Sequence, residues 1–180
     1  MTGQMYVRLP KERIGAAVGP NGTAKREIER RCGVKLTLNS KTGEVRIDSG
    51  ENPLGALKAK DVIVAIARGF SPERAFRLFE DDQLLEILDI RDFAGGSDRA
   101  VIRLKGRLIG ERGKTRQILE QTTGTHISIY GRTVAAIGTV EQLNVAREAI
   151  QMLLSGAKHS TVYRFLERKR REMKLRKLSH

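Results

Sequence analysis

An internal repeat constrains the fold of this 180-residue chain more than any other feature of its sequence. When the two halves are aligned so that Gly19 meets Gly110, Gly22 also meets Gly113 without a gap. Further identical or similar residues coincide in the same register: Glu29 with Glu120, Gly33 with Gly124, Lys25 with Arg116, Ile28 with Leu119, Leu36 with Ile127 and Leu38 with Ile129. Matches that share one register predict that one structural unit is used twice.

The first repeat predicts a definite order of elements. An extended stretch ends at Pro10, a short helix ends at a Gly-Pro-Asn-Gly break, and a second helix carries apolar residues on one face. Gly33 suits the end of that helix because glycine tolerates positive φ, and the alternation that follows predicts strands. Asn52 followed by Pro53 marks a helix start. The expected elements are strand 5–9, helices 13–18 and 23–32, strands 34–38 and 44–48, and a long helix from residue 53.

The second repeat predicts the same order with one insertion. Residues 91–98 are additional, and they contain a glycine pair followed by Ser97, a candidate helix N-cap. Between the repeats, Ser71-Pro72 starts a short helix whose Ala75, Phe76 and Phe79 are expected to cover the first core. The expected elements of the second repeat are strand 84–90, helix 114–123 after the second glycine loop, strands 125–130 and 133–138, and helix 140–154.

In both repeats the order is strand, helix, GxxG, helix, strand, strand, helix, which resembles the type I KH domain. Gly19-Pro20-Asn21-Gly22 and Gly110-Glu111-Arg112-Gly113 stand where that domain carries its GxxG loop. We therefore expect an α+β chain of two tandem type I KH domains, each a three-stranded sheet packed on three helices. The expected domains are residues 1–80, including the trailing short helix, and residues 81–157, followed by a basic helical extension at 158–180.

The charge balance points to a polyanionic partner. The chain has 34 Lys and Arg against 21 Asp and Glu, a formal net charge of +13. A membrane is not expected, since the apolar run Val62–Ala67 is far shorter than the ~18 residues that a spanning helix needs. Aromatic residues make up 4% of the chain, which disfavours modules that stack bases on a sheet and favours a KH backbone clamp.

Catalysis and metal binding find no support in the sequence. Cys32 is the single cysteine, so no internal disulfide can form, and we expect a buried thiol in a cytoplasmic protein. Cys32, His126, His159 and His180 are scattered, so no metal site is expected. No catalytic triad or carboxylate pair is evident, and we expect no enzyme activity, no cofactor and no small-molecule substrate.

KH-type loops bring RNA phosphates against a helix N-terminus, where free N–H groups and the helix dipole favour anions. In the second repeat the predicted RNA-binding residues are Lys105, Arg107, Gly110, Glu111, Arg112, Gly113, Lys114, Thr115 and Arg116. In the first repeat they are Gly19, Pro20, Asn21, Gly22, Thr23, Lys25 and Arg26. We expect the second loop to bind single-stranded RNA more tightly, because the first has no cation inside it and Pro20 lacks a backbone donor.

Gly113-Lys114-Thr115 resembles the end of a nucleotide-binding P-loop, but that motif is not complete. Its first glycine should stand at position 108, which is leucine, and the preceding segment is helical rather than a strand. An ATPase is therefore a rejected alternative.

The C-terminal segment from Arg164 to His180 is strongly basic, with eight Lys or Arg and two acids. Ser160 is expected to cap a helix whose Val162, Leu166 and Met173 form a partial apolar stripe. Two interpretations stay open: a solvated terminal helix, or an electrostatic arm that adds phosphate contacts.

Three segments resemble the Partner-of-Nob-one (Dim-two) family of small-subunit assembly factors, especially its archaeal members: residues 104–116, residues 124–131 and residues 163–170. The resemblance implies a factor that binds the 3′ region of small-subunit ribosomal RNA. It also implies as partners a Nob-type endonuclease, a dimethyladenosine methyltransferase and the alpha subunit of translation initiation factor two. Lys25 and Arg116 stand where KH domains usually carry an aliphatic residue, so the details of the groove remain open.

Two other functions remain as alternatives. One is an exosome-type KH adaptor of RNA decay, which the same loops would serve. The other is a protein-docking scaffold whose degenerate loops no longer bind RNA.

Overall fold

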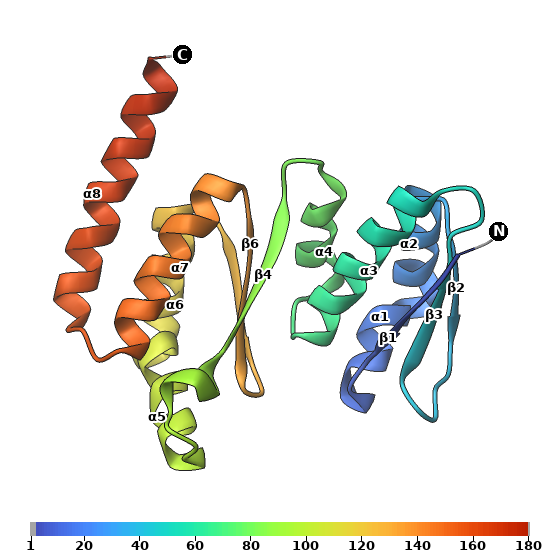
Figure 1. The fold of residues 1–180 in the computed structure, drawn as a ribbon, viewed down its shortest axis with the longest axis horizontal. Helices are drawn as coiled ribbons and strands as arrows, with labels where there is room; N and C mark the ends of the chain where they lie inside the picture. The colour runs from blue at the N-terminus through green and yellow to red at the C-terminus, as the bar shows by residue number, and fades with distance from the viewer. Residues whose placement is uncertain (1–2, 180) are drawn as a thin grey trace. The chain divides into compact units, whose positions relative to one another are not determined.

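The computed structural model describes residues 3–179, which form two compact units divided between Leu85 and Glu86 (Figure 1). The division falls inside strand β4 (Leu84–Asp89), whereas the sequence placed it after residue 80, before that strand begins. The C-terminal helix belongs to the second unit. Each unit is described below by itself.

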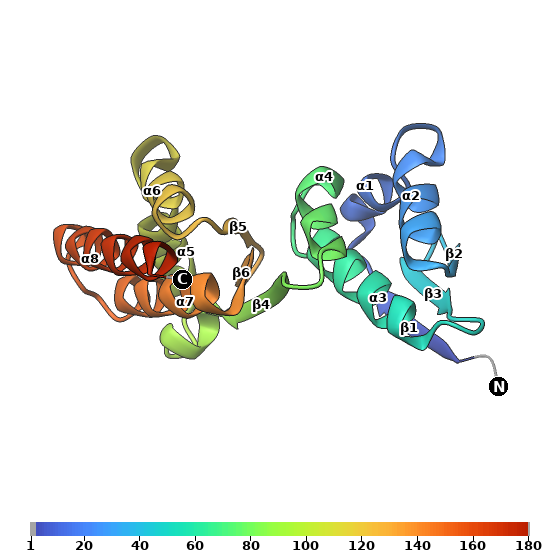
Figure 2. The same ribbon diagram turned by 90° about the horizontal axis from the view of Figure 1, so that it is seen from above.

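The first unit contains a three-stranded antiparallel sheet in the order β1-β3-β2. Helices lie on one face of this sheet, and within the unit its other face is uncovered (Figures 1 and 2). The elements are β1 Gln4–Arg8, α1 Ile14–Val18, α2 Thr23–Cys32, β2 Lys35–Leu38, β3 Glu44–Asp48, α3 Pro53–Ala67 and α4 Pro72–Ala75, with short 3-10 turns at Lys11–Arg13, Pro20–Gly22 and Phe76–Phe79.

The core of the first unit follows the apolar pattern of the sequence. Ile28 and Cys32 on α2 are buried, as are Val45 and Ile47 on the inner face of β3. Burial raises the pKa of the Cys32 thiol, in keeping with its expected role as a small apolar residue. The Asn52 side chain accepts a hydrogen bond from Gly55 N and donates one to Cys32 O, which ties the start of α3 to the end of α2.

The second unit repeats this architecture with a sheet in the order β4-β6-β5. The additional residues of this repeat form a turn and lengthen its first helix, which has 12 residues in α5 against 5 in α1. Ser97 caps α5 as expected. The elements after β4 are a 3-10 turn Ile90–Phe93, α5 Asp98–Ile109, a 3-10 turn Glu111–Gly113, α6 Lys114–Thr123, β5 His126–Tyr130, β6 Thr133–Gly138, α7 Val140–Leu154 and α8 His159–Leu178.

One of the repeated identities has the same structural role in both units. Glu29 accepts a hydrogen bond from Leu36 N, and Glu120 accepts one from Ile127 N, both at 2.9 Å. Each carboxylate therefore links the second helix to the strand that follows it. The predicted tandem type I KH architecture is confirmed by this order and by both sheet topologies.

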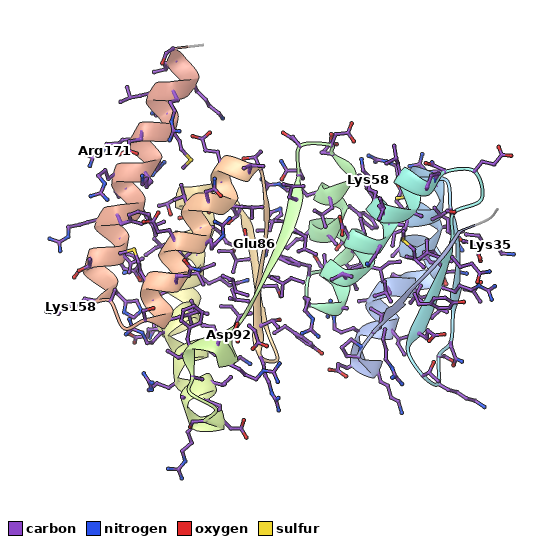
Figure 3. The ribbon with its side chains drawn as sticks, in the orientation of Figure 1. Lys35, Lys58, Glu86, Asp92, Lys158 and Arg171 are labelled. Atoms are coloured by element: carbon purple, nitrogen blue, oxygen red, sulfur yellow. The ribbon has the colours of Figure 1, made fainter. Side chains whose placement is uncertain are left out.

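Helix α8 contacts α6 and α7, on the side of the helix layer away from the sheet (Figures 1 and 2). Val162, Phe165 and Leu166 are buried there, while Arg171 is exposed on the helix (Figure 3). The expectation that Ser160 caps this helix is wrong, because the helix begins at His159 and Lys158 is its N-cap. His159 instead holds this end of the helix through a 3.0 Å hydrogen bond between its Nε2 and Arg107 O.

Among residues 3–179 no helix is long and apolar enough to cross a membrane. The same residues contain no cluster of His, Cys, Asp and Glu that could hold a metal ion, and His180 lies outside them.

Candidate nucleic-acid interface

The two GxxG loops have nearly the same backbone conformation. The first glycine has φ 75° and ψ 170° at Gly19, and φ 74° and ψ 173° at Gly110. The third residue adopts positive φ in both loops, 54° at Asn21 and 55° at Arg112, and within the described chain no other non-glycine residue does so. Asparagine tolerates this region, but for arginine it is strained. Such strain is often found at functional sites, and it singles out Arg112.

The first glycine of each loop is required by packing within the protein. A Cβ on Gly19 would lie 2.8 Å from both Cβ and N of Ala24. A Cβ on Gly110 would overlap the hydroxyl of Thr115 and lie 2.7 Å from its backbone nitrogen. The loop therefore lies directly on the first turn of the next helix in both units.

The second glycine of the second loop is required for a different reason. No atom lies within 4 Å of a Cβ built on Gly113, although its φ of 75° favours glycine. In the first loop the corresponding space over Gly22 contains the guanidinium of Arg26, 2.9 Å from the built Cβ. The surface at Gly113 is thus open to an approaching ligand, and the surface at Gly22 is partly occupied by a cation.

Helices α2 and α6 begin at these second glycines, which have no side chain to cap them. The first N–H groups of each ten-residue helix therefore lack a side-chain cap, and the positive end of the helix dipole faces the loop. The N–H groups of Thr23 and Lys114 donate within the preceding 3-10 turns, to Pro20 O and Glu111 O. The helix dipole and the open surface at Gly113 together favour a phosphate at the second loop.

Beside the first loop lies an apolar groove between the helices and strand β2. Lys25 stands where KH domains usually carry an aliphatic residue, and here it is one of the residues that line the groove. The lining residues are Ala17, Val18, Lys25, Ile28, Leu36, Leu38, Val45 and Ile63. The matching Arg116 of the second unit has its guanidinium 4.0 Å from the Glu120 carboxylate.

The other predicted site residues fall into two groups. Those with exposed side chains at or near the loops are Pro20, Asn21, Thr23, Arg26, Glu111, Arg112 and Lys114, with Lys105 half-buried on α5. Two others are engaged inside the protein. Thr115 is only 2% exposed, and its hydroxyl forms a 2.9 Å hydrogen bond with the hydroxyl of Tyr163 on α8. We therefore no longer place the Thr115 side chain among the RNA contacts.

Arg107 is the second predicted residue with an internal partner. Its guanidinium donates to Leu153 O at 2.9 Å and to Ala157 O, so it binds the carbonyl end of α7. Arg13 does the same in the first unit, donating to Ile66 O and Phe70 O at 2.9 and 2.7 Å. Cations stabilise helix C-termini, so both arginines hold the fold rather than face the loop.

The sequence did not predict the structural roles of Arg13 and Tyr163. Arg13 stands six residues before its loop and Arg107 three, so the gap-free alignment of the repeats does not pair them. Tyr163 lies outside the repeat, in α8, and no periodicity marks it as the partner of a loop residue. Its hydrogen bond to Thr115 links the C-terminal helix to the first turn of α6, directly after the second loop.

Comparisons with known proteins agree with this geometry. Residues 84–171 match the model of the second PNO1 KH domain, described as a eukaryotic type KH domain of type I. The chain is 45% identical over 171 residues to a KH domain-containing protein of Methanocaldococcus jannaschii, covering 93% of this chain and 74% of that protein. It is 30% identical over 132 residues to the pre-rRNA-processing protein PNO1 of Coccidioides immitis, covering 72% of this chain and 52% of that protein.

A solved structure is similar over nearly the whole chain. It is a chain of the a/eIF2α–aDim2p–rRNA complex of Pyrococcus horikoshii, with a TM-score of 0.88 and 45% identity, covering 95% of this chain and 96% of that one. The chain spans about half the length of the fungal PNO1 protein, so the activity of that whole protein is not carried over here. On these matches, the chain belongs to the PNO1/Dim2 family of tandem KH-domain proteins of pre-rRNA processing.

Proposed function

We propose that this chain is a non-catalytic factor of small-subunit ribosome biogenesis that binds single-stranded ribosomal RNA, with the second GxxG loop as its main contact. The observation that carries the proposal is the open surface at Gly113, directly over the uncapped N-terminus of α6. Arg112 and Lys114 add exposed cations on either side of that glycine.

In the proposed complex the RNA backbone lies against the Gly113 surface. N–H groups of the first turn of α6 donate to phosphate oxygens, and the strained Arg112 holds its guanidinium at the loop. KH domains hold about four nucleotides beside such a loop. Gly110 takes no direct part, because its role is to let the loop lie on Thr115.

The first loop is proposed as the weaker contact. Pro20 lacks the backbone N–H that Glu111 has at the same position of the second loop. Arg26 supplies a cation there, but its guanidinium occupies the space over Gly22 that is open over Gly113. A phosphate must move that side chain before it can reach the backbone.

The proposed RNA is the 3′ region of small-subunit ribosomal RNA, and the proposed compartment is the cytoplasm. Support for an rRNA ligand comes from the similar Pyrococcus horikoshii chain, which was solved in a complex with rRNA and a/eIF2α. We propose the alpha subunit of initiation factor two as a protein partner on the same support. A Nob-type endonuclease and a dimethyladenosine methyltransferase are further proposed partners, on the family resemblance alone.

The test is a titration of the full chain with three short single-stranded RNAs: a small-subunit rRNA 3′-end sequence, its scrambled version and poly(A). Each is measured with the wild type, with Gly113→Asp and with Gly22→Asp. We expect preference for the rRNA sequence and a larger loss for Gly113→Asp, because the carboxylate repels phosphate at the open surface. Preference for poly(A) would instead favour an RNA-decay adaptor. Binding that neither substitution changes would leave a protein-docking scaffold.

A further inference from the structure

We propose that the uncovered face of the first unit's sheet is a second contact for single-stranded RNA, in which a base stacks on Tyr6 beside Arg46. The inference rests on the proposed RNA-binding function and extends it to a surface outside both GxxG loops. The nucleotide it binds is one that leaves the groove of the first unit over strand β2.

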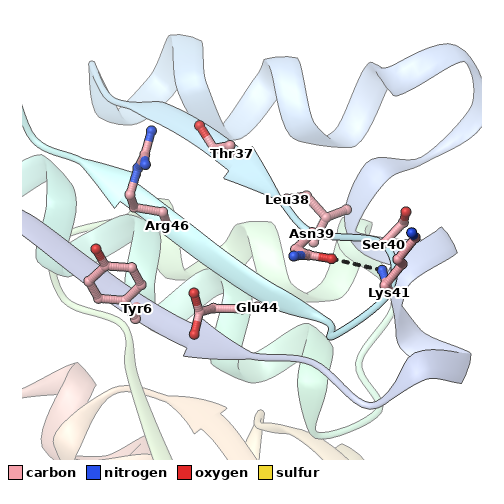
Figure 4. Close-up of a pocket in the computed structure, with 8 residues that line it drawn as sticks. All are labelled: Tyr6, Thr37, Leu38, Asn39, Ser40, Lys41, Glu44 and Arg46. Atoms are coloured by element: carbon pink, nitrogen blue, oxygen red, sulfur yellow. Dashed lines mark hydrogen bonds between the residues drawn. The ribbon is translucent and has the colours of Figure 1, made fainter.

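Side chains that could take part are gathered on this face by the strand register. Tyr6 on β1 is paired with Arg46 on β3, and Arg46 is paired with Thr37 on β2. These three residues form one row across the sheet, at the strand spacing of about 4.8 Å. Figure 4 shows Tyr6 and Arg46 projecting from neighbouring strands on the same side.

The row opens into a hollow that continues to the turn after β2. Its floor is polar, and Tyr6 is the large aromatic residue in it, 54% exposed. The lining residues are Tyr6, Thr37, Leu38, Asn39, Ser40, Lys41, Glu44 and Arg46. The turn is held in shape by Asn39, whose Oδ1 accepts hydrogen bonds from the backbone nitrogens of Lys41 and Thr42 at 2.9 and 3.2 Å.

The hollow and the groove of the first unit meet at one shared lining residue. Leu38, the last residue of β2, lines both the apolar groove beside the first loop and the hollow on the outer face. Strand β2 is an edge of the sheet, so nothing else within the unit's sheet separates the two surfaces. An RNA strand that follows the groove to Leu38 would turn over this edge and cross β3 to reach Tyr6, two strand spacings or about 10 Å further.

The chemistry of the face suits a nucleotide better than a protein side chain. Cations border the hollow at Arg8, Lys41 and Arg46, and Lys35 projects outward from the β2 edge (Figure 3). Glu44 and Asp48 are the acids of the same face, and Asp48 pairs with Arg46 at 3.3 Å. The face therefore carries excess positive charge around a single exposed ring, which is the combination that stacks a base and attracts its phosphate.

The chain has few aromatic residues, 4% of the sequence, and Tyr6 exposes one of them on a strand. The hydroxyl of Tyr6 donates to Gln4 Oε1 at 3.0 Å on the same exposed strand, and the side chain is 54% exposed, so the ring is not held there by burial. Tyrosine is common in strands, so it is the exposure of this ring beside a hollow bordered by cations that points to a ligand. A stacking role accounts for an aromatic side chain at this place.

The test uses the full chain carrying Gly113→Asp, so that binding at the second loop does not mask the first unit. Two RNAs are compared: one of about four nucleotides, which fills the groove, and one extended by about four more. Tyr6→Thr keeps a residue suited to a strand, and Tyr6→Phe keeps the ring without the hydroxyl. We expect Tyr6→Thr to bind the longer RNA about tenfold more weakly, the shorter one unchanged, and Tyr6→Phe to behave as the parent does.

A photocrosslink provides an independent measurement. Long RNA with 4-thiouridine beyond the groove should crosslink to the tryptic peptide that ends at Arg8, and the crosslink should disappear in Tyr6→Thr. Equal affinities of Tyr6→Thr and its parent for the longer RNA, without that crosslink, would overturn the inference. So would a Gly113→Asp chain that binds no RNA while the wild type does. If the wild type binds neither RNA, the proposed function itself fails, and this inference fails with it.

Discussion

At the scale of single residues, the two glycines of each GxxG motif have different roles, although the motif treats them alike. Gly110 is pressed against Thr115 at φ 74° and ψ 173°, a region almost confined to glycine. Gly113 has an ordinary left-handed conformation with open space around it. The first glycine therefore builds the loop, and the second exposes it.

This difference predicts unequal effects on stability. Gly110→Ala should lower the free energy of unfolding by about 3 kcal/mol, because strain and overlap with Thr115 act together. Gly113→Ala should lower it by about 1 kcal/mol, the cost of the left-handed conformation alone. Urea unfolding of the two variants measures the difference. Equal losses would mean that Gly110 is not constrained by its packing.

Because Arg112 has a strained backbone, we expect its replacement to make the protein more stable and its RNA binding weaker. Arg112→Gly should raise the free energy of unfolding by about 1 kcal/mol, because glycine has no penalty at φ 55°. The same change should weaken RNA binding, since a cation leaves the loop. Asn21→Gly is the matched control, because asparagine tolerates this conformation and less stability is gained there. A variant that loses stability and keeps its affinity would contradict this role for Arg112.

At the scale of elements, much of the fold is predictable because local signals and the repeat agree. The bounds of α2 at Thr23–Cys32 and of α6 at Lys114–Thr123 follow from a glycine at each end. The loops could be located because GxxG recurs in register. The internal contacts of Arg107 and Thr115 could not be, because each depends on a partner about fifty residues away in sequence, at Leu153 and Tyr163. The residue pattern within one helix or strand does not identify a partner that far away in the sequence.

Arg13 and Arg107 bind carbonyl groups at the C-terminal ends of α3 and α7. We therefore expect substitution of Arg107 to change the stability of the protein more than its affinity for RNA. Arg107→Ala should cost about 2 kcal/mol of stability, because two carbonyls at the end of α7 lose a charged donor. Arg112→Ala removes an exposed cation and should cost far less. Thermal or urea unfolding of both variants, beside their RNA affinities, separates the two roles. A stable Arg107→Ala chain with lost affinity would place Arg107 at the RNA after all.

Helix α8 predicts two separable contributions. Its first half is linked through Tyr163 to the first turn of α6, directly after the second loop, and its second half carries exposed cations such as Arg171. If that half acts as an electrostatic arm, deleting residues 168–180 should weaken binding to all RNAs alike and reduce the slope of log affinity against log salt. Affinity and slope that stay unchanged would show that these cations are simply solvated.

At the scale of the whole molecule, a net charge of +13 makes some RNA binding inevitable, so affinity alone says little about the loops. A loop contact differs from general electrostatic attraction in one respect. RNA affinity should change when a single loop residue is replaced by one of similar size and different charge. Each unit has its own core, so a change at the second loop leaves the first unit as an internal reference. This separation permits a direct test of the central claim.

The most direct measurement compares Gly113→Asp with Gly113→Asn for binding to a single-stranded rRNA 3′-end sequence at two salt concentrations. Both side chains fit the open space and tolerate the left-handed conformation; they have nearly the same size and differ in charge and in the N–H donors of the amide. If phosphate lies on Gly113, the aspartate variant should bind at least about tenfold more weakly than the asparagine variant, and the gap should persist at high salt. Equal affinities that fall together as salt rises would show that RNA is held by net charge and that the second loop is not its binding site.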